Sequence, residues 1–188
     1  FINKMDRTGS DFHGCLRMMV DRLHTTPLLL QLPMGKEEDF WGTIDLIAMK
    51  ALVYDSENLG ANFDIVDIPQ EYMKEALRQR GILIERLAEW DEAVMEKFVE
   101  GKDVSEMELK RAVRNGTLHL KGTPILCGAS FRNKGVQPLL DAIIDYLPSP
   151  LDVPPVKGVD LEGKDLSFSA NNGHPLSALA FKIMSDPY

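Results

Sequence analysis

Asn3, Lys4 and Asp6 form an Asn-Lys-x-Asp box directly after two hydrophobic residues. Guanine presents its N1–H and N2–H₂ donors on one edge, and one carboxylate can accept both in a charge-assisted pair. Asp6 is therefore predicted to read this edge, since adenine offers no matching pair of donors. The Lys4 stem can lie along the face of the base, and the Asn3 amide can tie the loop to its neighbours or reach N7.

A second loop of small residues follows the apolar segment Thr123–Cys127. Gly128, Ala129 and Ser130 carry little side-chain bulk, so a backbone N–H of this loop can approach the guanine O6. We expect the strands before the two loops to lie side by side in one parallel sheet, because such sheets bind ligands at the carboxyl ends of their strands. This arrangement would bring Asp6 and Ala129 together across one purine pocket.

The segment from Gly158 to Lys164 nearly matches a phosphate-binding loop, but the sequence argues against that function. The next residue is Asp165 and not the Ser or Thr that would bind Mg²⁺. Asp160 and Glu162 would place negative charge against phosphates, and no helix is predicted to follow. We therefore expect a turn between two strands here.

No phosphate-loop pattern stands before the Asn-Lys-x-Asp box. We therefore expect the chain to be an internal piece of a larger GTP-binding protein, carrying base recognition but no catalytic residue.

Composition narrows the class of protein further. The 188 residues are 44% hydrophobic and 27% charged, which is typical of a globular chain. The net charge of −8 argues against DNA binding and against a polybasic membrane surface. No apolar run approaches the ~18 residues of a membrane span and no signal peptide is present, so we expect a cytoplasmic protein. Two cysteines and four scattered histidines predict neither a disulfide framework nor a metal site.

The predicted fold class is α/β, with part of a P-loop-type parallel sheet interrupted by an inserted α+β subdomain. Residues 1–27 and 119–150 are expected to supply the GTP-binding part. Ser10 is predicted to cap its first helix, and Pro138 is predicted to lie in the first turn of its last helix. Residues 28–118 are expected to form the insertion, and residues 151–188 a linker and a truncated further domain.

Within the insertion, alternation of apolar residues predicts strands first and helices afterwards. The phase of the alternation slips near Met49, which indicates a bulge or two separate strands. The expected strands cover 27–33, 41–54 and 63–68. The expected helices begin at Gln70, after a cap at Asp91, and after a capping box at Ser105. A last strand is expected over Leu176–Met184.

Several segments closely resemble the elongation factor G family of translational GTPases, in order and spacing. They are Phe1–Gly9, Gln31–Gly35, Cys127–Gly128 with Asn133–Gln137, Asp145–Pro150 and Leu179–Ile183. The resemblance covers essentially the whole chain and is far more specific than the box alone. It implies that residues 28–118 are the subdomain inserted in the GTP-binding domain, and that residues 151–188 begin a β-barrel second domain.

The resemblance also implies a function and roles for single residues. The full factor would bind GTP or GDP with Mg²⁺, hydrolyse GTP and move tRNA and mRNA on the ribosome. Asp6 would pair with guanine, Lys4 would stack on the base and ribose, and Asn3 would brace the pocket. Ala129 or Ser130 would contact O6 through the main chain.

The same resemblance sets expectations for partners and for the chain on its own. The inserted subdomain would meet the stalk protein of the large ribosomal subunit. The phosphate loop, the switch regions and the catalytic histidine of the family lie outside this chain. We therefore expect the chain alone to be inactive and to bind no nucleotide tightly.

One departure from the family and two alternatives qualify this hypothesis. The family usually has Gly-Ser-Ala where this chain has Gly128-Ala129-Ser130. A backbone contact to O6 should survive the exchange, but a hydroxyl that braces the Asn-Lys-x-Asp loop would be misplaced. The first alternative is a non-catalytic module that binds the ribosomal stalk. The second is a fragment of a paralogous ribosome-recycling, tetracycline-protection or release-factor GTPase.

Overall fold

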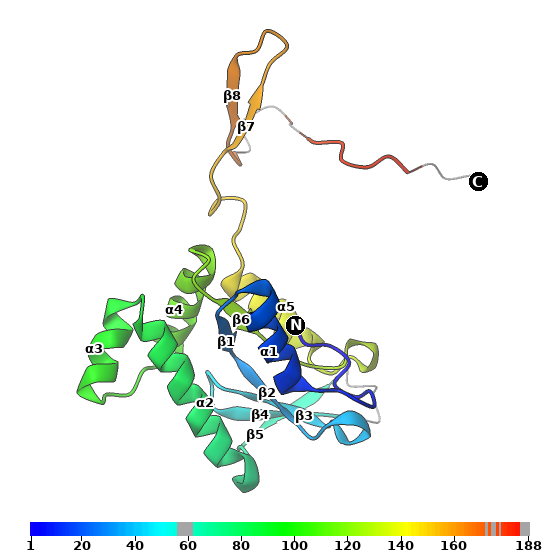
Figure 1. The fold of residues 1–188 in the computed structure, drawn as a ribbon, viewed down its shortest axis with the longest axis vertical. Coiled ribbons are helices and arrows are strands. Elements are labelled where there is room, and N and C mark those ends of the chain that lie inside the picture. The colour runs from blue at the N-terminus through cyan, green and yellow to red at the C-terminus, as the bar shows by residue number, and fades with distance from the viewer. Residues whose placement is uncertain (56–61, 172, 174–175, 177, 185–188) are drawn as a thin grey trace. The chain divides into compact units, whose positions relative to one another are not determined.

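The computed structural model describes residues 1–55, 62–171, 173, 176 and 178–184. The chain divides into two compact units, Phe1–Leu147 and Pro148–Tyr188. The first unit combines a parallel sheet, a four-stranded antiparallel sheet and the helices that pack on them (Figure 1). The predicted α/β class is confirmed.

The parallel sheet carries the two loops predicted to bind guanine. Strand β1 (Pro27–Leu29) pairs in parallel with β6 (Thr123–Ile125). Ile2 forms a parallel bridge with Cys127, just beyond the end of β6. The segments that lead into the two predicted loops therefore run side by side and in the same direction, as the sequence predicted.

The antiparallel sheet has the strand order β2-β3-β4-β5. Its strands are β2 (Gln31–Met34), β3 (Gly42–Asp45), β4 (Lys50–Tyr54) and β5 (Phe63–Val66). The turn between β3 and β4 includes Met49 in a left-handed conformation, with φ of 53°. The slip in alternation near Met49 thus marks two strands and not a bulge.

The single strand predicted between the two prolines is in fact two strands in different sheets. The N–H of Leu30 donates to the Ile125 carbonyl at 3.0 Å, while the Leu30 carbonyl accepts from the N–H of Leu46 at 2.9 Å. The chain therefore leaves the parallel sheet and enters the antiparallel sheet at Leu30. The insertion was expected to cover residues 28–118. If it begins where the chain enters the antiparallel sheet, its first residue is Leu30, and its boundaries stay a prediction.

The first helix, α1 (Phe12–Leu23), is capped by Asp11. The predicted cap, Ser10, is one residue too early. The Asp11 carboxylate accepts from the N–H of Gly14 at 2.8 Å. The Ser10 hydroxyl instead donates to the Met5 carbonyl at 3.0 Å. Ser10 therefore fixes the preceding loop, and the neighbouring acidic residue takes over the cap.

The other helices follow the predicted signals closely. Asp91 caps α3, Gly101 ends it in a left-handed conformation, and Ser105 forms a capping box with Glu108 at the start of α4. Pro138 lies in the first turn of α5. The bounds are α2 (Gln70–Ala88), α3 (Glu92–Glu100), α4 (Glu106–Leu118) and α5 (Val136–Tyr146). Two short 3₁₀ helices, η1 (Glu37–Asp39) and η2 (Ser130–Arg132), complete the unit.

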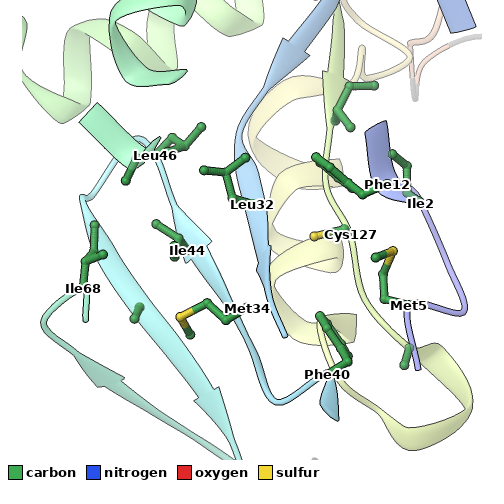
Figure 2. Close-up of a cluster of buried hydrophobic side chains, with 14 residues drawn as sticks. Ile2, Met5, Phe12, Leu32, Met34, Phe40, Ile44, Leu46, Ile68 and Cys127 are labelled. Atoms are coloured by element: carbon green, nitrogen blue, oxygen red, sulfur yellow. The ribbon is translucent and has the colours of Figure 1, made fainter. Parts of the chain in front are cut away.

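A buried hydrophobic cluster joins the two sheets of the first unit (Figure 2). Ile2, Met5 and Cys127 contribute from the segments around the two loops. Met34 and Ile44 contribute from the antiparallel sheet and are fully buried. Burial of this apolar surface fixes the loop segments against the antiparallel sheet.

The second unit contains a hairpin of β7 (Val156–Val159) and β8 (Asp165–Phe168). Asp160 accepts from the N–H groups of Glu162 and Lys164, so the near match to a phosphate loop is a turn between strands, as predicted. The strand predicted over Leu176–Met184 is absent from its described residues, and Ser177 lies outside them. The apolar side chains there are exposed, such as Phe181 at 89%, because no described strand pairs with this segment.

A search of the described residues finds no helix with the length and apolar character needed to span a membrane.

Candidate guanine-recognition site

Main-chain hydrogen bonds hold the two predicted loops together. The N–H of Ile2 donates to the Leu126 carbonyl at 2.8 Å, and the N–H of Met5 donates to the Gly128 carbonyl at 3.1 Å. Position 128 needs glycine, because an added Cβ would lie 2.3 Å from the Lys134 carbonyl oxygen. The second loop can thus fold back on itself only because this position carries no side chain.

The Asn3 side chain ties the first loop to the second. Its Oδ1 accepts from the N–H of Ser130 at 2.9 Å and from the N–H of Lys4 at 2.8 Å. Its Nδ2 lies 2.8 Å from the Ser130 hydroxyl, which accepts the bond. The exchange of Ala129 and Ser130 was expected to misplace the bracing hydroxyl. That expectation is wrong, because the hydroxyl reaches Asn3 from position 130.

Four of the five predicted residues line one pocket of about 660 Å³. They are Asn3, Lys4, Asp6 and Ser130. Ala129 does not line this pocket, since it is 1% exposed and its N–H donates to the Lys134 carbonyl at 2.9 Å. The structure therefore places Ala129 behind the pocket wall and Ser130 on its surface.

Charged groups converge on the Asp6 carboxylate. Nε of Arg132 lies 3.0 Å from Oδ2 of Asp6, whose side chain is 13% exposed. Lys134 is nearby, and burial together with the positive charge of Arg132 lowers the pKa of its ammonium group, an effect that Asp6 partly opposes. Within the pocket lining, the shielded Asp6 carboxylate is thus paired with Arg132, whereas Lys134 does not line the pocket.

The sequence analysis missed several residues of this pocket. Phe131 is 99% exposed, and Phe131 and Arg132 line the pocket from the second loop. Glu38 lines it from η1, in the segment predicted to be inserted. An aromatic and a basic residue directly after a small-residue loop were a usable signal for the first two. No local pattern pointed to Glu38.

The described residues contain no group of three or more His, Cys, Asp or Glu side chains placed to bind a metal ion. The pocket instead offers acceptors, donors and an aromatic face, which suit a heterocyclic base.

Comparison with known proteins decides the family. The model of the elongation factor Tu GTP-binding domain matches residues 1–149. The chain belongs to this family.

Two relatives extend this result. The chain is 48% identical over all 188 residues to elongation factor G of Rhodopseudomonas palustris (strain BisB18), and it covers 27% of that protein. A crystal structure from Thermus thermophilus matches with a TM-score of 0.68 and 28% identity, over 84% of this chain and 24% of that chain. The predicted resemblance to elongation factor G is confirmed, and the chain spans about a quarter of the length of its curated relative.

Proposed function

We propose that this chain carries the guanine-recognition half-site of a translational GTPase of the elongation factor G type. The observation that supports this proposal is the shared pocket of Asp6 and Ser130, which come from loops more than a hundred residues apart in the sequence. A carboxylate for the donor edge of guanine and a small-residue loop for O6 are the two parts that such a site requires.

Asp6 would accept from N1–H and N2–H₂ of guanine while keeping its contact with Arg132. A carboxylate offers about four lone-pair sites on two oxygens, so Oδ2 can accept from Arg132 and from the base together. Hydrogen bonds to a carboxylate are stronger than those between neutral groups.

Ser130 would supply the main-chain contact to O6, because it lines the pocket and Ala129 does not. Its N–H would then be shared between O6 and the Oδ1 of Asn3. The Lys4 stem and the exposed ring of Phe131 would cover the faces of the base.

The whole factor would bind GTP or GDP with Mg²⁺, hydrolyse GTP in the cytoplasm and move tRNA and mRNA on the ribosome. This proposal rests on the similarity to elongation factor G, of which the chain covers 27%. The contacts to phosphate and Mg²⁺ and the catalytic group are proposed to come from other parts of such a factor.

The Asp6→Asn substitution in the full-length factor tests the site. The amide can donate to the carbonyl that xanthine carries at C2, so GDP affinity should fall and XDP affinity should rise, each by about 10- to 100-fold. Binding of both nucleotides is measured by titration calorimetry.

Asp11→Asn is the matched control, since asparagine caps a helix as well as aspartate does. It should leave the preference for GDP over XDP unchanged. An Asp6→Asn variant that keeps its ordinary preference for GDP would refute the role of Asp6.

A second function is favoured by the outer face of α3 and α4. Val99 and Met107 are 76% and 79% exposed, and Glu100 and Glu106 adjoin them in the sequence. We propose that this face contacts the stalk protein of the large ribosomal subunit.

The double substitution Val99→Asp and Met107→Asp should abolish capture by purified stalk protein, whereas Leu161→Asp, at an exposed leucine of the second unit, should not. Equal capture of both variants would exclude this face.

A further inference from the structure

The turn between β2 and β3 contacts the Asn-Lys-x-Asp loop through Glu37. The N–H of Glu37 donates to the Met5 carbonyl at 2.9 Å, and its Oε1 accepts from the N–H of Gly9 at 2.9 Å. One residue therefore binds this loop on both sides of Asp6, with its main chain before the aspartate and its carboxylate after it.

The same turn also holds the second loop. Nζ of Lys134 donates to the Phe40 carbonyl at 2.7 Å and lies 5.8 Å from the centroid of the Phe40 ring. Lys134 is 8% exposed, and its main chain forms an antiparallel bridge with Ala129. Figure 2 shows Phe40 in the same buried cluster as Met5 of the first loop. The turn from Lys36 to Phe40 is thus bonded to both loops of the pocket.

The backbone of this region is strained in two places. Glu37 has φ of 54° and Lys4 has φ of 64°, a left-handed conformation that is unfavourable for residues other than glycine. Such conformations persist where surrounding contacts hold them. The two bonds of Glu37 to the first loop are contacts of this kind.

We propose that Glu37 is a positioning residue for the guanine site, which holds the Asn-Lys-x-Asp loop so that Asp6 meets the donor edge of the base. This inference rests on the proposed guanine recognition. On this proposal, the turn from Lys36 to Phe40, in the predicted insertion, belongs to the nucleotide site. The insertion then contributes to base selectivity although none of the described residues in its α-helices lines the pocket.

The test compares GDP with IDP in the full-length factor carrying this segment. IDP lacks the 2-amino group of guanine, so it makes only one of the two bonds to Asp6. The ratio of the two dissociation constants therefore reports how well Asp6 is placed. A change confined to overall stability would lower the melting temperature and leave this ratio unchanged.

Glu37→Gly removes the carboxylate and permits the left-handed backbone, so it isolates the bond to Gly9 without adding strain. We expect it to weaken GDP binding by about tenfold and IDP binding much less. Glu37→Gln keeps an oxygen acceptor and should restore GDP affinity to within about twofold of the parent. Asp39→Ala, at an exposed position of the same turn, should change the affinity for neither nucleotide.

Three results would overturn the proposal. They are an unchanged ratio of GDP to IDP affinity in Glu37→Gly, equal losses in Glu37→Gln and Glu37→Gly, or an equal loss in Asp39→Ala. A parent protein that does not prefer GDP to IDP would instead refute the guanine site itself.

Lys134→Met, which removes the donor to Phe40, supplies a second variant. Combined with Glu37→Gly it should lower GDP affinity by less than the product of the single effects, because both act through one turn.

Discussion

Asn3 satisfies three hydrogen-bonding groups with one amide, two of them on the second loop. An amide carries two acceptor lone pairs and two donors, so it can serve a backbone N–H and a hydroxyl at once. The fit between Asn3 and Ser130 explains how the site tolerates the exchanged order of Ala129 and Ser130. In this chain the hydroxyl at position 130 bonds directly to the Asn3 amide.

Substitutions at these two positions should therefore have unequal effects. Ser130→Ala removes one acceptor and should lower the free energy of unfolding by about 1 kcal/mol. Asn3→Ala leaves two N–H groups and a hydroxyl without this partner and should lower it by about 2–3 kcal/mol. Urea unfolding of both variants measures the difference. A loss in Ser130→Ala equal to that in Asn3→Ala would show that the backbone bonds to Asn3 contribute little.

At the scale of elements, α3 and α4 are joined by a charged cluster at their ends. Glu108 accepts from the Lys97 ammonium at 2.7 Å and from the hydroxyl and N–H of Ser105. The Lys97 bond, followed by those from Ser105, lowers the pKa of Glu108 to about 2.

This shift predicts a pH dependence of stability. The folded pKa lies below the ordinary value of 4.5, so the contribution of Glu108 is fully present above that value. It is lost as the pH falls from 4.5 toward about 2. The difference in unfolding free energy between the parent and Glu108→Gln should therefore shrink over this range. A difference that is constant from pH 7 to about 2 would contradict this assignment.

Substitution by alanine should have opposite effects on stability at two helical glycines. At Gly116 in α4, an added Cβ would lie 2.8 Å from Nε1 of Trp90, whereas at Gly81 in α2 it would meet no atom within 4 Å. Gly81→Ala should stabilise the protein by about 0.5–1 kcal/mol through helix propensity. Gly116→Ala should destabilise it by about 1–3 kcal/mol, because the partly buried indole must move. Thermal and urea unfolding compare the two, and equal stabilisation would show that the Trp90 ring moves freely.

At the scale of the whole molecule, the chain corresponds to 27% of the related elongation factor G. Phosphate and Mg²⁺ contacts dominate nucleotide affinity in GTPases, and we propose that other parts of such a factor supply them. We therefore expect the chain from Phe1 to Tyr188 to show no measurable GDP binding by calorimetry and no GTP hydrolysis. A micromolar affinity for GDP would mean that the base site contributes far more than this argument allows.

Local signals in the sequence predicted the features that depend on neighbouring residues. The caps at Asp91 and Ser105 and the turn at Asp160 depend on side chains that bond to backbone only a few positions away. The cap of α1 was misplaced by one residue, because Ser10 and Asp11 compete for the same role and Met5 holds Ser10. The split at Leu30 was missed, because its two partners are far away in the sequence.

The amino-acid sequence alone determined the box and the small-residue loop, each directly after an apolar segment, because residue type and hydrophobic pattern are read locally. Only the tertiary structure decided that Arg132 pairs with Asp6, that Ala129 lies behind the pocket wall, and that Glu37 holds the first loop. These contacts join segments that meet only when the sheets pack. Their geometry depends on the folded backbone, and no local pattern carries that information.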